Sequence, residues 1–285
     1  SNDESVAFIQ SVLITNALTK GWFCTMSIQP LWTWQHLLLS PLYLYQAKQV
    51  KKNTLRLDEP LGERYGTTAF VDANPQQPPL KVLIIGDSAG VGVGVEHQDQ
   101  AFLGQFVTGL SQDKALAQYY SQIDWQLEAT TGYTSFDILR QLYVMEAYAV
   151  DIVVISMGVN DTVMNLAVTQ WQDNLQAMIA ILKRKFCAKH ILFVSIPPLQ
   201  LMPALPSPLN SFMGRMAQRL DTALQQVVKD TPSTSNQQVH YLLANFEKAG
   251  LDKTTLFAKD GFHPSAFTYQ NWAKNMVDFV TEILL

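Results

Sequence analysis

Apolar residues after position 80 follow two alternating patterns. Short runs that are apolar throughout, or at every second position, are typical of strands, and they cover residues 81–85, 123–129, 152–156, 191–196 and 240–243. Longer segments repeat apolar residues every three to four positions, as amphipathic helices do, and they cover residues 98–110, 135–149, 166–185 and 269–284. Strands alternating with helices predict an α/β fold with a parallel sheet covered on both faces.

Residues 1–79 follow neither pattern. Residues 21–47 contain no Asp, Glu, Lys or Arg, and prolines and polar side chains interrupt the stretch, which argues against a membrane-spanning helix. We predict one or two helices packed on the main domain, while peripheral membrane contact through residues 21–47 and a dimer contact stay open. Residues 72–79 are polar and Pro-rich. Residues 1–79 are therefore predicted to be an apolar, helical extension with a linker, and residues 80–285 the main domain.

Composition narrows the class of protein. The chain is 48% hydrophobic, only 15% charged, and carries a net charge of −4, so no basic field calls for nucleic acid. The two cysteines, Cys24 and Cys187, form neither a metal-ligand pattern nor a disulfide framework, which favours a reducing, cytoplasmic location. Membrane association, or a leader ahead of Ser1, stays open as an alternative. Composition leaves the oligomeric state open.

A nucleophile and a base stand out among the loops. Ser88 follows the first strand in Gly86-Asp87-Ser88, where its hydroxyl would lie at the carboxyl edge of the sheet. A serine hydroxyl needs a neighbouring base to take its proton. His263 is the one histidine of five that lies three residues after an acid, Asp260, in a Gly-containing loop before a helix. Each motif alone also fits a turn that caps a helix. The two motifs together predict a catalytic triad of Ser88, His263 and Asp260.

Two further motifs supply donors for an oxyanion. Gly132 and Asn160 follow the second and third strands, beside the loop of Ser88. The Ser88 and Gly132 N–H groups and the Asn160 amide are donors of the type that stabilises a tetrahedral oxyanion. Asp87 and Asp161 are predicted to shape the turns or cap the helices rather than to react.

The four motifs together resemble the SGNH (GDSL-type) hydrolase family, as in a bacterial esterase or lipase. The resemblance covers residues 80–285 and extends upstream through residues 41–62. It implies a three-layer α/β/α sandwich, flavodoxin-like, with a mainly five-stranded parallel sheet. It also implies a Ser-His-Asp triad that hydrolyses carboxylic esters through an acyl-enzyme, with no cofactor and no metal. Short acyl, lipid-like and acetylated sugar esters all stay open as small-molecule substrates, and the apolar loop at residues 197–208 mildly favours the first two.

Other interpretations fit fewer of the motifs. Gly86-x-Ser88-x-Gly90 also matches the elbow of α/β-hydrolases, but residues 1–79 supply no strands ahead of it. The glycines at 90, 92 and 94 have the wrong spacing for a dinucleotide loop. An acyltransferase that uses the same site, or a non-catalytic binding protein on this fold, remains the alternative.

Overall fold

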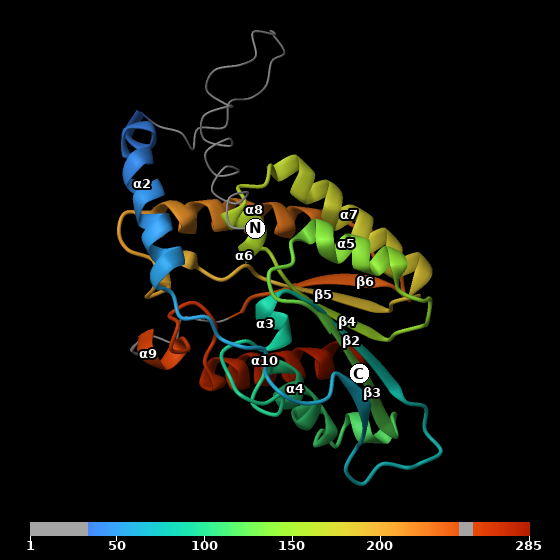
Figure 1. Ribbon diagram of the computed structural model, residues 1–285. Helices are drawn as coiled ribbons and strands as arrows, with labels where there is room; N and C mark the ends of the chain where they lie inside the picture. The colour runs from blue at the N-terminus through green and yellow to red at the C-terminus, as the bar shows by residue number, and fades with distance from the viewer. Residues whose placement is uncertain (1–33, 245–252) are drawn as a thin grey trace. The chain divides into compact units, whose positions relative to one another are not determined.

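The computed structural model describes residues 34–244 and 253–285 (Figure 1). The chain divides into two compact units, residues 1–47 and 48–285. The described part of the first unit belongs to helix α2 (Trp34–Asn53), which contains Pro41 and continues into the second. None of the helices in the described residues is long and apolar enough to cross a membrane. Residues 21–33 of the stretch for which membrane contact stays open lie outside the described residues.

The second unit is built around a six-stranded sheet. The strand order is β1-β3-β2-β4-β5-β6, in which β1 runs antiparallel to β3 and all other neighbours are parallel. The strands are β1 (Tyr65–Ala69), β2 (Leu80–Gly86), β3 (Gln122–Ala129), β4 (Ile152–Ser156), β5 (His190–Val194) and β6 (Gln238–Leu242). The five parallel strands have the flavodoxin-like order, so the predicted sheet is confirmed. The sixth strand, β1, lies ahead of the predicted domain start at residue 80.

Helices cover both faces of the sheet (Figure 1). One core joins α5, α7 and α8 to strand residues such as Leu83 and Ile85, and a second joins α4 and α10 to Val82 and Ile84, because successive strand side chains point to opposite faces. This arrangement confirms the three-layer α/β/α fold. The helices of this unit are α3 (Ser88–Val91), α4 (Phe102–Ser111), η1 (Leu116–Gln118), α5 (Ser135–Val144), α6 (Val159–Val163), α7 (Val168–Lys185), η2 (Leu199–Leu201), α8 (Leu209–Asp230), α9 (Lys253–Leu256) and α10 (Ala266–Leu284).

Three local features differ from the sequence prediction. Helix α8 falls in a segment for which no element was predicted, and it begins directly after Pro208 without a side-chain cap. Helix α5 ends at Val144 rather than at residue 149, and the Lys185 ammonium donates to the carbonyl of Leu142 in its last turn. In the loop at residues 197–208, Leu199 and Met202 are buried in the core. These two side chains therefore belong to the core, whereas Leu201 and Leu205 of the same loop are half-buried.

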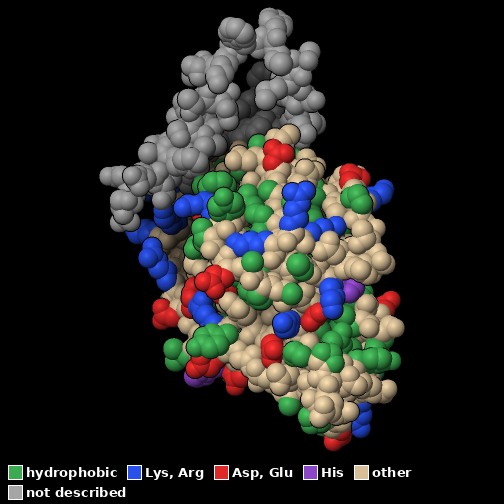
Figure 2. Space-filling view, turned by 90° about the vertical axis from the view of Figure 1, so that its right-hand side faces the viewer, with side chains coloured by type: hydrophobic (Ala, Val, Ile, Leu, Met, Phe, Trp, Pro, Cys, Tyr) green, Lys and Arg blue, Asp and Glu red, His purple; other side chains and the backbone are tan. Residues whose placement is uncertain are grey.

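Charge on the visible face of the described residues is mixed in sign. Figure 2 looks from the right-hand side of Figure 1, away from α9, and shows Lys and Arg side chains interspersed with Asp and Glu. A face of this kind lacks the single-sign field that steers a polyanion.

Candidate active site

The four predicted motifs converge on one edge of the sheet. Ser88 follows β2, Gly132 lies in the turn after β3, and Asn160 lies in α6 directly after β4. These strands are neighbours, in the order β3-β2-β4. The connection after β2 leads to β3 on one side, and the connection after β4 leads to β5 on the other side. A reversal of this kind is the topological switch point, where open α/β sheets bind ligands.

The turn after β2 presents Ser88 at the start of a helix. A side chain at Gly86 would clash with the carbonyl oxygen of Ser156 on β4, so this close approach requires glycine. Asp87 then caps α3, and its carboxylate accepts the N–H of Ala89 at 3.1 Å. Ser88 is the first residue of α3, where a backbone N–H has no partner within the helix. The turn thus offers a hydroxyl and an unused N–H side by side.

His263 connects Ser88 to Asp260. Its Nε2 lies 2.9 Å from the Ser88 Oγ, and its Nδ1 lies 2.5 Å from the Asp260 Oδ2. The Asp260 side chain is 1% exposed and that of His263 is 26% exposed. An ionised carboxylate can only accept, so the His263 Nδ1 carries the proton and its Nε2 is left to accept the Ser88 O–H.

Asp260 is held in place by its own loop. Its Oδ1 accepts the N–H groups of Phe262 and His263 at 3.0 and 3.1 Å. Burial raises the pKa of Asp260, but hydrogen bonds from the His263 ring and the Phe262 N–H outweigh it and hold the pKa below its ordinary value. Asp260 is therefore ionised at neutral pH and fixes the orientation of the imidazole.

Contacts between residues far apart in the sequence hold the loop of Asp260 and His263 against the end of α3. Gly94 has a φ of +119°, and a side chain there would clash with the carbonyl oxygen of Pro264, next to His263. The buried Tyr269 hydroxyl of α10 donates to the carbonyl of Val93 at 2.8 Å, consistent with α3 and α10 lying close together in Figure 1. Neither Gly94 nor Tyr269 was predicted from the sequence to support the site. Their signals, one more glycine and one residue of a helical stripe, do not stand out.

Gly132 and Asn160 lie close to each other across the same edge. Gly132 has a φ of +87°, is exposed, and has no heavy atom within 4 Å of the position that a Cβ would take. The Asn160 amide donates one N–H to the carbonyl of Tyr133 at 2.9 Å, which fixes its orientation and leaves its second N–H for another acceptor. Gly132 thus faces open space, and the neighbouring Asn160 amide has an N–H group to spare.

A buried network joins the Asn160 turn to the Gly132 turn. The Asp161 carboxylate, 1% exposed, accepts the Ser135 N–H at 3.0 Å and the Ser135 hydroxyl at 2.6 Å. The Ser135 Oγ in turn accepts the Asn174 amide at 2.8 Å. Burial raises the pKa of Asp161, while the hydrogen bonds from Ser135 act in the opposite direction. Asp161 therefore joins α6 to the first residue of α5. It lies inside α6, whose N-cap is Gly158, so it does not cap that helix as the sequence predicted.

Asp87 is a second buried acid at the site. It is 2% exposed. Burial, with a contribution from the nearby Asp161 charge, raises the pKa of Asp87 to about 7. Its carboxylate faces the backbone of α3, which agrees with a capping role rather than a reactive one.

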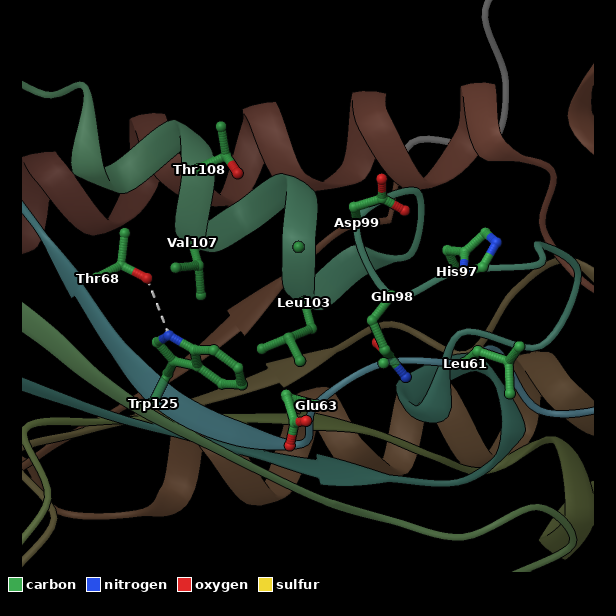
Figure 3. Close-up of a pocket in the computed structure, with 12 residues that line it drawn as sticks. Leu61, Glu63, Thr68, His97, Gln98, Asp99, Leu103, Val107, Thr108 and Trp125 are labelled. Carbon is green, nitrogen blue, oxygen red and sulfur yellow. Dashed lines mark hydrogen bonds between the residues drawn. The ribbon is translucent and has the colours of Figure 1, made fainter.

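Two cavities lie away from these residues. One of about 380 Å³ lies between β1, β3 and α4, with Trp125 and Thr68 at one end and His97 and Leu61 at the other (Figure 3). The second, of about 310 Å³, is bordered by the ends of β5 and β6 and by α8. Neither is lined by Ser88, Gly132, Asn160 or His263. Within residues 34–244 and 253–285, no three His, Cys, Asp or Glu side chains are grouped so that they could hold a metal ion.

Comparisons with solved structures show the same fold. A member of the lipolytic protein G-D-S-L family from Veillonella parvula has a TM-score of 0.51 at 13% identity, covering 71% of this chain and 98% of its own. The psychrotrophic esterase EstA from a Pseudoalteromonas species has a TM-score of 0.50 at 20% identity, with 72% and 98% covered. TesA has a TM-score of 0.50 at 21% identity, with 72% and 99% covered. At these identities the likeness concerns the fold.

Comparisons of sequence identify the family. No relative among curated proteins matches this chain. The profile of the GDSL-like lipase/acylhydrolase family matches residues 84–270, about two thirds of the chain, and this range includes Ser88, Gly132, Asn160 and His263. The chain belongs to the GDSL-like lipase/acylhydrolase family of hydrolases.

Proposed function

We propose that this protein is a serine esterase that hydrolyses carboxylic esters through an acyl-enzyme. The observation that carries the proposal is the hydrogen-bonded series from the Ser88 Oγ through both nitrogens of His263 to the buried Asp260 carboxylate. This arrangement of nucleophile, base and orienting acid is the one that activates a serine hydroxyl.

Acylation follows from the geometry. The His263 Nε2 takes the proton of Ser88 as its Oγ forms a bond to the ester carbonyl carbon, and the ionised Asp260 stabilises the imidazolium that results. The imidazolium then gives its proton to the departing alkoxide as the ester C–O bond breaks. Water repeats these steps on the acyl-Ser88 ester and releases the carboxylic acid.

The transition state places a negative charge on the carbonyl oxygen. We propose that the N–H groups of Ser88 and Gly132 and the second Asn160 N–H hold this oxygen. The proposal is supported by their positions after three neighbouring strands and by the open space beside Gly132. One donor of this type contributes on the order of 3 kcal/mol to the transition state.

Replacement of the nucleophile tests the proposal. Ser88→Ala is expected to lower p-nitrophenyl acetate hydrolysis by at least about 10³-fold, while Ser233→Ala, an exposed serine far along the chain, retains the rate. A monoethylphosphonate ester is the matching covalent probe, since the EstA structure is described as inhibited by monoethylphosphonate. It is expected to add one phosphonyl group to the wild type and none to Ser88→Ala. Full hydrolysis by Ser88→Ala would refute the assignment.

A panel of substrates identifies which class of ester the protein hydrolyses. Esters of graded acyl length and acetylated sugars, each compared with Ser88→Ala, give kcat/KM for the short acyl, lipid-like and carbohydrate classes. An added alcohol acceptor in the same assay distinguishes hydrolysis from acyl transfer by the product that forms.

A further inference from the structure

The Gly132 turn is held by its neighbours on three sides. The Thr130 N–H donates to the carbonyl of Gly86 on the side of β2. The carbonyl of Tyr133 accepts the Asn160 amide on the side of β4. The third side is Thr131, which faces the segment ahead of β1.

An ion pair in that segment holds Thr131. The Glu59 Oε1 accepts the Thr131 N–H at 3.1 Å and the Thr131 hydroxyl at 2.6 Å. The Glu59 Oε2 accepts the Arg64 guanidinium at 2.5 Å, and the other arm of Arg64 donates to the carbonyl of Ala129 at 3.0 Å. Glu59 and Arg64 together therefore bind the backbone on both sides of Thr130, at the end of β3.

We propose that Glu59 and Arg64 form a clamp that positions the Gly132 N–H for the oxyanion, which makes them positioning residues for the reaction proposed above. Gly132 follows Thr131 directly, its φ of +87° favours glycine, and glycine has no side chain that could fix the turn. The Tyr133 N–H closes the turn by donating to the carbonyl of Thr130 at 3.2 Å, and the clamp holds Thr131 between these two residues. The clamp fixes the plane of the peptide group between Thr130 and Thr131, directly before the peptide group that carries the Gly132 N–H.

The Glu59–Arg64 ion pair is better suited to positioning the turn than to stabilising the fold. Burial raises the pKa of Glu59, but the two Thr131 hydrogen bonds and Arg64 outweigh it and hold the pKa below its ordinary value. Glu59 is therefore ionised at neutral pH and accepts three hydrogen bonds. Its side chain is 36% exposed and that of Arg64 is 38% exposed, and ion pairs as exposed as this add little to stability. Loss of the clamp is therefore expected to leave the fold intact and to change the rate.

Three substitutions grade the loss of the clamp. Glu59→Gln keeps an oxygen for Thr131 but loses the charge that pairs with Arg64, and we expect a kcat within a few-fold of the wild type. Thr131→Val removes one of the two hydrogen bonds at constant shape. Glu59→Ala removes both, and we expect kcat to fall by about 10- to 100-fold with little change in KM, since a small misplacement of an oxyanion donor has effects of this size.

A substrate with sulfur in place of the carbonyl oxygen distinguishes a misplaced Gly132 N–H from a general loss of structure. Sulfur is a weak hydrogen-bond acceptor, so an oxyanion donor contributes less to cleavage of a thionoester than of the matching ester. The ratio of kcat/KM for p-nitrophenyl acetate to that for its thiono analogue should fall in Glu59→Ala and Thr131→Val in step with kcat. Damage elsewhere in the fold lowers both rates and leaves the ratio unchanged.

The matched control is an ion pair at the opposite edge of the sheet. Lys189 pairs with Asp151 at 2.7 Å, where β4 and β5 begin, and Lys189→Ala is expected to keep both kcat and the ratio. If Glu59→Ala fails to fold, Thr131→Val decides by itself. Wild-type kcat and an unchanged ratio in the clamp variants, with Ser88→Ala inactive, would overturn the clamp alone. Activity that survives Ser88→Ala would instead overturn the proposed function.

Discussion

Asp87 makes the stability of this protein depend on pH in an unusual direction. The carboxyl group is 2% exposed, and burial raises its pKa to about 7. Asp87→Asn keeps an oxygen to accept the Ala89 N–H and removes the charge. The substitution therefore isolates the cost of ionising this side chain inside the fold.

The sign follows from proton binding. With a pKa of about 7 when folded, against 3.8 as its ordinary value, Asp87 binds more protons in the folded than in the unfolded state between these values. Its contribution to the free energy of unfolding therefore falls as pH rises from about 4 to about 7 and stays low above that. A difference of about 3 pKa units corresponds to at most about 4 kcal/mol. Asp260 and Glu59, whose pKa values are lowered, lose their stabilisation only as pH falls through lower values.

Thermal unfolding of both proteins at pH 5, 6, 7 and 8 measures the effect. We expect the Tm of Asp87→Asn relative to the wild type to rise with pH, by several degrees between pH 5 and pH 8, since about 1 kcal/mol moves the Tm of a unit of this size by roughly 2–4 °C. Asp173→Asn, at an exposed position on α7, serves as the control and should show a constant difference. An Asp87→Asn difference that is equal at pH 5 and pH 8 would refute the reasoning.

Two further substitutions test the proposed roles around Ser88. Asp260→Asn should lower kcat by about 10⁴-fold because the neutral amide no longer selects the proton on the His263 Nδ1; a loss under tenfold would contradict that role. Asn160→Ala should lower kcat by about 10²- to 10³-fold with a small effect on KM. Hydrolysis by Asn160→Ala should also slow less than hydrolysis by the wild type when sulfur replaces the carbonyl oxygen of the ester. An equal slowing in both proteins would show that Asn160 does not bind the oxyanion.

The core of the fold could be predicted because burial leaves a strong signal. Strands β2, β4 and β5 are almost wholly buried and read as unbroken apolar runs. Parallel strands place their carboxyl ends at one edge, so Ser88, Gly132 and Asn160 could be grouped from chain position. The pairing of His263 with Ser88 rested on motif order, and the structure adds its physical basis in Gly94 and Tyr269, which join segments with no local relation.

The elements that sequence reasoning missed lack such a signal or begin without one. Strand β1 is five residues long, lies at the edge of the sheet and alternates between exposed and half-buried positions, so no apolar run marks it. Helix α8 has a clear apolar stripe that includes Leu220, Leu224 and Val227. Its start, however, follows five prolines and has no capping side chain, so no start signal marks the helix.

The edge strand also explains how residues ahead of the family match reach the site. The register pairs Tyr65 with Gln126, and the Leu127 N–H donates to the carbonyl of Arg64. This pairing sets the Arg64 side chain at the level of Ala129, where β3 ends. The profile match begins at residue 84, so an antiparallel strand outside it delivers a charged residue to the turn that carries Gly132. Without this short strand at the edge of the sheet, Glu59 and Arg64 would have no fixed path to the Gly132 turn.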